Sequence, residues 1–189
     1  MRILACADLH GRPERIERVR RLVVDLAPEV VLLPGDLTHA GQGLDALSLL
    51  HTLPVPVLAV AGNMDDAGAV TAMRRHGALL EAEARVLGGV AFAGPEAEVP
   101  CDVLVVHEPP FGVLDTVRSG GRIGSPTVRD QMLRLRPRVL TCGHVHESPG
   151  VVRIGDTLVV NCTMGDGVSA GALIEIDADV TARLLTAPP

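Results

Sequence analysis

An apolar run that stops at a glycine and an acid, Val30-Val31-Leu32-Leu33-Pro34-Gly35-Asp36, sets the pattern for the whole chain. A short apolar segment bounded by Gly and polar residues is typical of a buried strand. Comparable runs end directly before Asp8-Leu9-His10, Gly62-Asn63, His107 and Gly143-His144-Val145-His146. Open α/β folds bind ligands beyond the carboxyl ends of their strands. The recurrence therefore predicts a sheet protein whose polar strand ends gather at one edge.

The first part of the chain alternates strands with helices. The expected strands are Arg2–Ala7, Val30–Leu33 and Val55–Ala61. After Pro13, a first helix is expected from the helical spacing of Ile16, Val19, Val23 and Leu26. A second helix is expected around Leu44, Leu47 and Leu50, and a short third helix extends to Met73. Pro favours the first turn of a helix, and successive strand–helix units indicate a mainly parallel sheet.

The later part favours short strands joined by turns. We expect a hairpin over 86–93, strands over 102–106 and 139–142, a helix that Ser125 caps before Pro126, and final strands over 151–154, 157–160, 172–176 and 180–185. The loop from Glu108 to Ser125 is long, and such loops are usually functional or mobile. Strand–helix units followed by hairpins, without repeat or linker, predict one domain over residues 1–189.

Composition narrows the class of protein. A chain of 189 residues with 47% apolar residues can bury a core, while the absence of Trp and Tyr disfavours single-stranded nucleic-acid platforms. The net charge is −6, and every basic residue is Arg, so nucleic acid is not the expected partner. The cysteines form no C-x-x-C pair and the first apolar run is too short for a leader or a membrane span. We expect reduced thiols, no membrane association and a cytoplasmic location.

The polar strand ends supply the chemistry of a metal site. Carboxylate and amide oxygens suit hard divalent cations, and imidazole suits Mn, Fe, Zn and Ni. Each short motif alone is weak, but together they predict a shared site. Residues two apart in an extended segment point to the same side, so we expect Asp8 and His10, and likewise His144 and His146, to face one cavity. Asp36 is the candidate carboxylate that contacts two ions.

In this order, the motifs resemble those of the calcineurin-like metallophosphoesterases over most of the chain. The stretches His107-Glu108-Pro109-Pro110 and Gly143-His144-Val145-His146-Glu147 are more similar to the small, phosphodiesterase-like members than to protein Ser/Thr phosphatases. The resemblance implies an α/β fold, a four-layer α/β/β/α sandwich of two mixed sheets flanked by helices.

The same resemblance implies a dinuclear site and a reaction. Two divalent ions, expected to be Mn²⁺ with Fe, Zn or Ni as alternatives, would share Asp36. Asp8, His10 and His146 would complete one site, and Asn63, His107 and His144 the other. A hydroxide bridging the two ions would then attack a small phosphate diester.

One position departs from the family pattern. The usual G-N-H-[DE] is here Gly62-Asn63-Met64-Asp65, and a thioether cannot donate a proton. The departure favours diesters over monoesters and leaves His39, Asp65 or a metal-bound water as the candidate proton donor. His39 is equally compatible with an ordinary exposed loop residue. Arg12 is a candidate phosphate contact, and Met64 either borders the substrate or only packs beside the cavity.

Two other functions remain open at this point. A non-catalytic metal-binding scaffold of the same fold is the main alternative, although such scaffolds typically lose ligands and here every position is filled. A nuclease is disfavoured by the acidic charge and the single expected domain. A homo-oligomer is compatible with the sequence.

Overall fold

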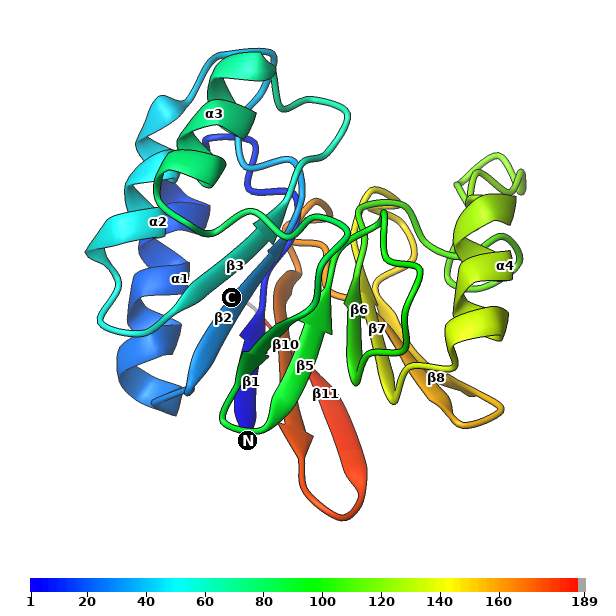
Figure 1. The fold of residues 1–189 in the computed structure, drawn as a ribbon. Helices are drawn as coiled ribbons and strands as arrows, with labels where there is room; N and C mark the ends of the chain where they lie inside the picture. Colours follow the sequence, from blue (N-terminus) through cyan, green and yellow to red (C-terminus); the bar gives the residue numbers. More distant parts are fainter. Residues whose placement is uncertain (187–189) are drawn as a thin grey trace.

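Two β-sheets lie face to face, and helices cover their outer faces (Figure 1). The computed structural model describes residues 1–186. The first sheet has the order β11-β10-β1-β2-β3 and the second the order β4-β5-β6-β7-β9-β8. Both sheets mix parallel and antiparallel pairs. The predicted four-layer α/β/β/α sandwich is confirmed.

The elements follow the predicted alternation. The strands are β1 (Arg2–Ala5), β2 (Val30–Pro34), β3 (Val57–Val60), β4 (Arg85–Leu87), β5 (Val90–Ala93), β6 (Val103–Val105), β7 (Val139–Cys142), β8 (Gly150–Ile154), β9 (Thr157–Asn161), β10 (Ser169–Ile176) and β11 (Val180–Thr186). The helices are α1 (Pro13–Leu26), the 3-10 helix η1 (Leu44–Ser48), α2 (Leu49–Thr52), α3 (Ala67–Arg75) and α4 (Pro126–Leu135).

Strand β1 shows how the layers are built. Ile3 and Ala5 face the core between the two sheets, where they meet residues of the second sheet such as Phe92. Leu4 and Cys6 point the other way and pack against the helices on the outer face of the first sheet. Successive side chains of a strand leave on opposite faces, so a continuous apolar run is buried on both sides. The outer face of the second sheet packs against α4 in the same manner.

The predicted connections are largely confirmed. Strands β1, β2 and β3 are parallel, and the hairpins β8–β9 and β10–β11 are antiparallel. Pro13 begins α1, and the side chain of Ser125 accepts a hydrogen bond from the amide of Val128 at the start of α4.

Several predicted boundaries were wrong. Strand β1 ends at Ala5 rather than Ala7, and β10 begins at Ser169 rather than Ala172. The second helix is not one regular helix but a 3-10 turn followed by a single α-turn, and Leu44 is 58% exposed instead of buried. Gly43, which precedes it in a left-handed conformation, provides no side-chain cap. Strand β3 begins at Val57 rather than Val55, because Pro56 has no amide hydrogen for the ladder.

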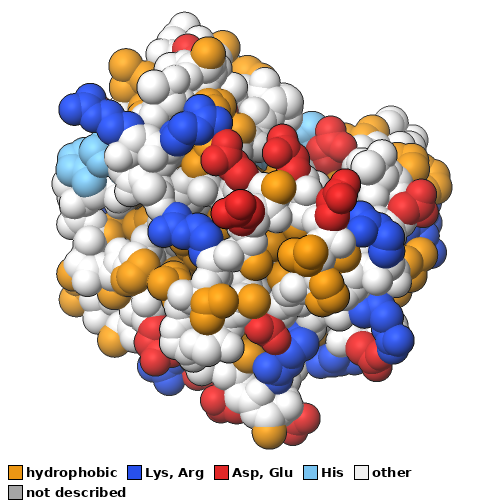
Figure 2. Space-filling model, in the orientation of Figure 1, with side chains coloured by type: hydrophobic (Ala, Val, Ile, Leu, Met, Phe, Trp, Pro, Cys, Tyr) orange, Lys and Arg blue, Asp and Glu red, His pale blue; other side chains and the backbone are white. Residues whose placement is uncertain are grey.

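The surface carries both signs of charge. On the face drawn in Figure 2, arginines lie among aspartates and glutamates and form no continuous basic surface. Among residues 1–186, no helix is long and apolar enough to cross a membrane. All four cysteines are free, and burial raises the pKa of Cys6 to about 12, so this thiol is unreactive.

Candidate metal centre

Residues that follow five strands come together at one rim of the sandwich. The first sheet supplies Asp8 and His10 after β1, Asp36 after β2 and Asn63 after β3. The second sheet supplies His107 after β6, and His144 and His146 after β7. Because both sheets contribute, the site lies where their carboxyl edges meet.

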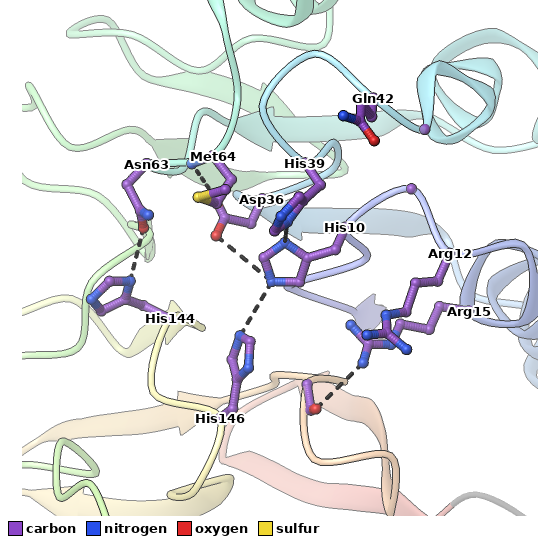
Figure 3. A pocket seen from close by; sticks show the side chains of 13 residues that line it. His10, Arg12, Arg15, Asp36, His39, Gln42, Asn63, Met64, His144 and His146 are labelled. Atoms are coloured by element: carbon purple, nitrogen blue, oxygen red, sulfur yellow. Dashed lines mark hydrogen bonds and ion pairs between the residues drawn. The ribbon is translucent and has the colours of Figure 1, made fainter.

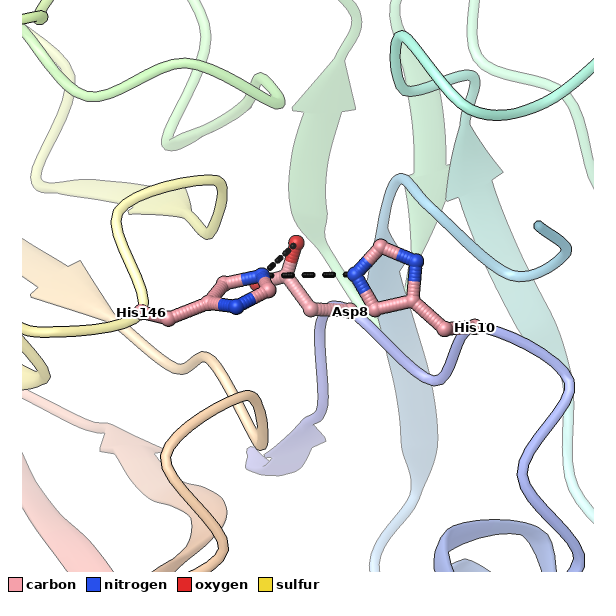
Figure 4. Close-up of side chains that lie close together, drawn as sticks. All are labelled: Asp8, His10 and His146. Atoms are coloured by element: carbon pink, nitrogen blue, oxygen red, sulfur yellow. Dashed lines mark hydrogen bonds and ion pairs between the residues drawn. The ribbon is translucent and has the colours of Figure 1, made fainter. Parts of the chain in front are cut away.

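One group of ligand atoms consists of Asp8, His10 and His146 (Figure 4). Nε2 of His10 lies 3.3 Å from Nε2 of His146, and the latter atom lies 3.5 Å from Oδ1 of Asp8. Asp8 is fully buried, and its carboxylate accepts hydrogen bonds of 3.0 and 3.1 Å from the amide of His144. The loop after β7 thus holds the carboxylate that follows β1.

The second group centres on Asp36 and His107. Oδ2 of Asp36 lies 3.5 Å from Nε2 of His107 and 3.8 Å from Nε2 of His10, so this oxygen faces both groups. Oδ1 of Asn63 lies 3.0 Å from Nε2 of His107 and 2.9 Å from Nδ1 of His144. Ligand atoms of Asp8, Asp36 and His107 also lie within 4.8 Å of one another, so the two carboxylates lie close to each other.

Strained backbone accompanies these side chains. Asp8, His10, Asp36 and His144 have φ values of 61°, 49°, 53° and 67°, in the left-handed region. The expectation that these segments are extended was therefore wrong, and tight left-handed turns aim the side chains instead. Such conformations are uncommon outside Gly and collect at functional sites, where the surrounding structure holds them.

Glycines allow the backbone to approach the ligands closely. A Cβ atom on Gly62 would lie 2.1 Å from Oδ1 of Asp36, and one on Gly165 would lie 2.2 Å from Cγ of His146. Neither distance is sterically possible. Any side chain at these two positions would displace a candidate ligand.

Burial and neighbouring charges shift the pKa values of the candidate ligands. Burial disfavours the charge on Asp8, but hydrogen bonding to His146 and the nearby imidazoles outweigh it and lower the pKa of that carboxyl. Burial also opposes the charge on His107, yet the hydrogen bond to Asp36 and the charges of Asp8 and Asp36 raise its pKa to about 9. Burial lowers the pKa of His10 and of His144, which favours their neutral, ligating form.

The donor set fits divalent cations. Nδ1 of His107 donates to the carbonyl of Pro34 over 3.0 Å, which directs Nε2 toward Asp36, as ligating histidines commonly do. Two nitrogens that each lie about 2.1 Å from one ion are separated by about 3.0–3.4 Å at octahedral or tetrahedral angles. The 3.3 Å between the Nε2 atoms of His10 and His146 falls in this range.

A cavity of about 620 Å³ opens above these residues, a size usual for small-molecule sites (Figure 3). The candidate substrate residues Arg12, His39 and Met64 line it. Asp65 does not. Its carboxylate accepts hydrogen bonds from the amides of Leu37, Thr38 and Gly62 and from the Thr38 hydroxyl.

Sequence reasoning missed Arg15, which also lines the cavity and is only 7% exposed. Its guanidinium donates to the carbonyl of Asp8 over 2.6 Å and to that of Gly165 over 3.3 Å. A signal was available, because Arg15 lies four residues before Val19 and so falls on the apolar face of the helix. His51 and His76 do not line the cavity and stack on each other, with ring centroids 4.6 Å apart.

Comparison with known proteins identifies the family. The model of the calcineurin-like phosphoesterase superfamily domain matches residues 1–167. The chain belongs to this superfamily. Its members depend on metals, and the candidate ligands are of the kind that such phosphoesterases require.

The chain is also similar to individual proteins in sequence or in fold. An uncharacterized protein of Methanocaldococcus jannaschii is 25% identical over 85% of this chain and 87% of its own length. Among solved structures, TT1561 of Thermus thermophilus aligns with a TM-score of 0.70 at 15% identity, over 97% of this chain and 98% of that one. A structure of an archaeal phosphodiesterase aligns with a TM-score of 0.67 at 14% identity, over 98% of this chain and all of that one.

Proposed function

We propose that the chain is a dinuclear metal-dependent hydrolase of phosphate diesters. The observation that carries the proposal is the convergence of two carboxylates, one amide and four imidazoles at the rim shared by both sheets. Half of the non-glycine residues with positive φ in the described chain belong to this set, which supports a functional origin for the strain. The likeness to an archaeal phosphodiesterase is compatible with diester chemistry.

The chain offers a full set of ligands for each ion. Asp8, His10 and His146 would hold one cation, Asn63, His107 and His144 the other, and Asp36 would contact both. When bound, such ions activate water and neutralise the charge on phosphate oxygens. The chain supplies the fixed geometry, since backbone amides orient both Asp8 and Asp36.

His39 is the proposed hydrogen-bond donor to the substrate. Its Nδ1 lies 3.5 Å from Nδ1 of His10. If His10 ligates through Nε2, the proton of its ring resides on Nδ1 and can be donated only to an acceptor. His39 Nδ1 is that acceptor, so Nε2 of a neutral His39 carries the hydrogen, and His39 is one of the residues that line the cavity.

Met64 accounts for the proposed preference for diesters. It lines the cavity beside Asn63, where the family pattern has a histidine, and its thioether neither donates a proton nor carries charge. A doubly charged monoester would therefore meet one positively charged side chain fewer than in the usual site of the family. Asp65 acts by position, because its four hydrogen bonds join the loop after β2 to the loop after β3.

Hydrolysis of two chromogenic esters tests the proposal. Protein loaded with Mn²⁺ is expected to cleave bis-p-nitrophenyl phosphate faster than p-nitrophenyl phosphate, and Asp36→Asn is expected to abolish both reactions. The matched control is His51→Ala, an exposed histidine outside the cavity. Metal-loaded wild-type protein without activity on either ester would favour the non-catalytic scaffold instead.

A further inference from the structure

Two arginines lie next to each other on one wall of the cavity. Arg12 and Arg15 both line it, and Figure 3 draws their guanidinium groups close together. Arg15 is 7% exposed, whereas the side chain of Arg12 is 59% exposed. Two like charges side by side repel each other, and an anion that binds to both relieves this repulsion.

Within residues 1–186, no carboxylate forms a close ion pair with Arg15. Both hydrogen bonds of Arg15 go to carbonyl oxygens, and within residues 1–186 no carboxylate oxygen lies within 4.0 Å of it. Arg12 reaches Glu14 only at 3.8 Å, and both side chains are about 60% exposed, so that contact is worth little. Asp166, next to the lining residue Gly165, accepts hydrogen bonds from the amides of Val168 and Ser169.

The arginine pair is separate from the centre of the metal ligands. In Figure 3 the ring of His10 lies between the two guanidinium groups and Asp36, and Asn63 and His144 lie at the far end. If a phosphate of the substrate is bound at Asp36, the two arginines remain available to bind another group of the same ligand. Among the described residues that line the cavity, Met64 is the only one with an apolar side chain, so the rest of the ligand is expected to be hydrophilic.

We infer that Arg12 and Arg15 bind a second phosphate of the substrate, separate from the diester that is hydrolysed. Guanidinium groups match phosphate oxygens in paired hydrogen bonds, and Arg15 has donors left after its two carbonyl contacts. The inference rests on the proposed function and specifies its substrate class as diesters that carry a further phosphate on one arm.

Two thymidine esters with the same leaving group test this assignment. They are thymidine 5′-(p-nitrophenyl phosphate) and its 3′-phosphorylated form. In wild-type protein loaded with Mn²⁺, the 3′-phosphate is expected to raise kcat/KM about tenfold, mainly through KM. Arg12→Gln should bring the ratio of the two kcat/KM values close to one. Arg12→Lys should keep part of the difference, and Arg21→Gln should leave the ratio unchanged. Arg21 lies on the same helix but faces Glu17 outside the cavity.

A binding measurement separates this inference from the proposed reaction. Calorimetry of the Mn²⁺-loaded chain compares thymidine 3′,5′-bisphosphate with thymidine 5′-phosphate, neither of which needs to be cleaved. Tighter binding of the bisphosphate that depends on Arg12 supports the site even if no ester is hydrolysed. The inference would be overturned if Arg12→Gln lowered kcat/KM equally for both esters or left both values unchanged, because the ratio between the esters would then stay the same.

Discussion

The backbone amide of Met64 donates a hydrogen bond of 2.8 Å to Oδ1 of Asp36. The other oxygen of Asp36 faces Nε2 of His10 and Nε2 of His107 at 3.8 and 3.5 Å. One oxygen therefore fixes the side chain, and the second is available to both groups of candidate ligands. The two oxygens of Asp36 therefore have different roles.

Asp36→Asn is expected to remove both metal ions. The amide oxygen can still accept the bond from Met64, so the loop should keep its shape, but the charge shared by both groups is lost. His10→Ala or His107→Ala should mainly weaken one site. Metal analysis after dialysis measures this, with His76→Ala as the control, and two tightly held ions in Asp36→Asn would exclude a bridging role.

Metal binding is expected to release protons at neutral pH. In the metal-free protein the pKa of His107 is about 9, so its ring is charged at pH 7 and must lose a proton to ligate. Affinity for Mn²⁺ should therefore rise as pH increases toward 9. Conversely, the stability that charged His107 gives the metal-free fold is complete below its ordinary pKa of about 6.5 and is lost as pH rises through 9.

Calorimetry in buffers of different ionisation enthalpy measures the released protons. His107→Ala should release fewer than wild type at pH 7. An equal number in both proteins would assign the protons to other groups.

His39→Ala is expected to lower kcat/KM about tenfold, because one hydrogen bond to the substrate is lost, with unchanged metal content. His39→Gln keeps a donor group but cannot give up a proton, so it separates hydrogen bonding from proton transfer. An unaffected rate in both variants would return His39 to an ordinary exposed loop residue.

The rate of hydrolysis is expected to fall steeply as the pKa of the leaving group rises. General acid catalysis contributes about 3–5 kcal/mol to the expulsion of poor leaving groups, and Met64 cannot provide it. Met64→His should therefore help alkyl esters more than aryl esters. A leaving-group series on both proteins measures the two slopes, and a flat slope in wild type would locate the donor elsewhere.

Asp65→Ala is expected to destabilise the fold by about 1–3 kcal/mol, because three amides and a hydroxyl lose their acceptor. Thermal unfolding of the metal-free chain measures the loss. Asp65→Asn, which keeps one acceptor oxygen, should recover part of it. A variant that unfolds like wild type but has lost activity would instead favour a chemical role for Asp65.

The strand ends explain why so much could be predicted from the sequence. Buried parallel strands are continuous apolar runs, so the turns at Asp8, Asp36 and Asn63 are visible as abrupt changes in polarity. The left-handed backbone at Asp8 and His144 was not predictable in this way, because it results from tertiary contacts such as the amide of His144 on the Asp8 carboxylate. Arg15 was missed for a related reason, since its partners are carbonyl groups, which sequence does not distinguish.

The two sheets contribute different ligands, and this division has a thermodynamic consequence. Asp8, His10, Asp36 and Asn63 belong to one sheet, and His107, His144 and His146 to the other. A cation that used ligands from both would contribute its binding free energy to the association of the sheets. Since a ligand at one hundred times its Kd adds about 2.7 kcal/mol to stability, the melting temperature would itself report how full the site is. Cellular metal supply would then govern the lifetime of the folded protein as well as its catalysis.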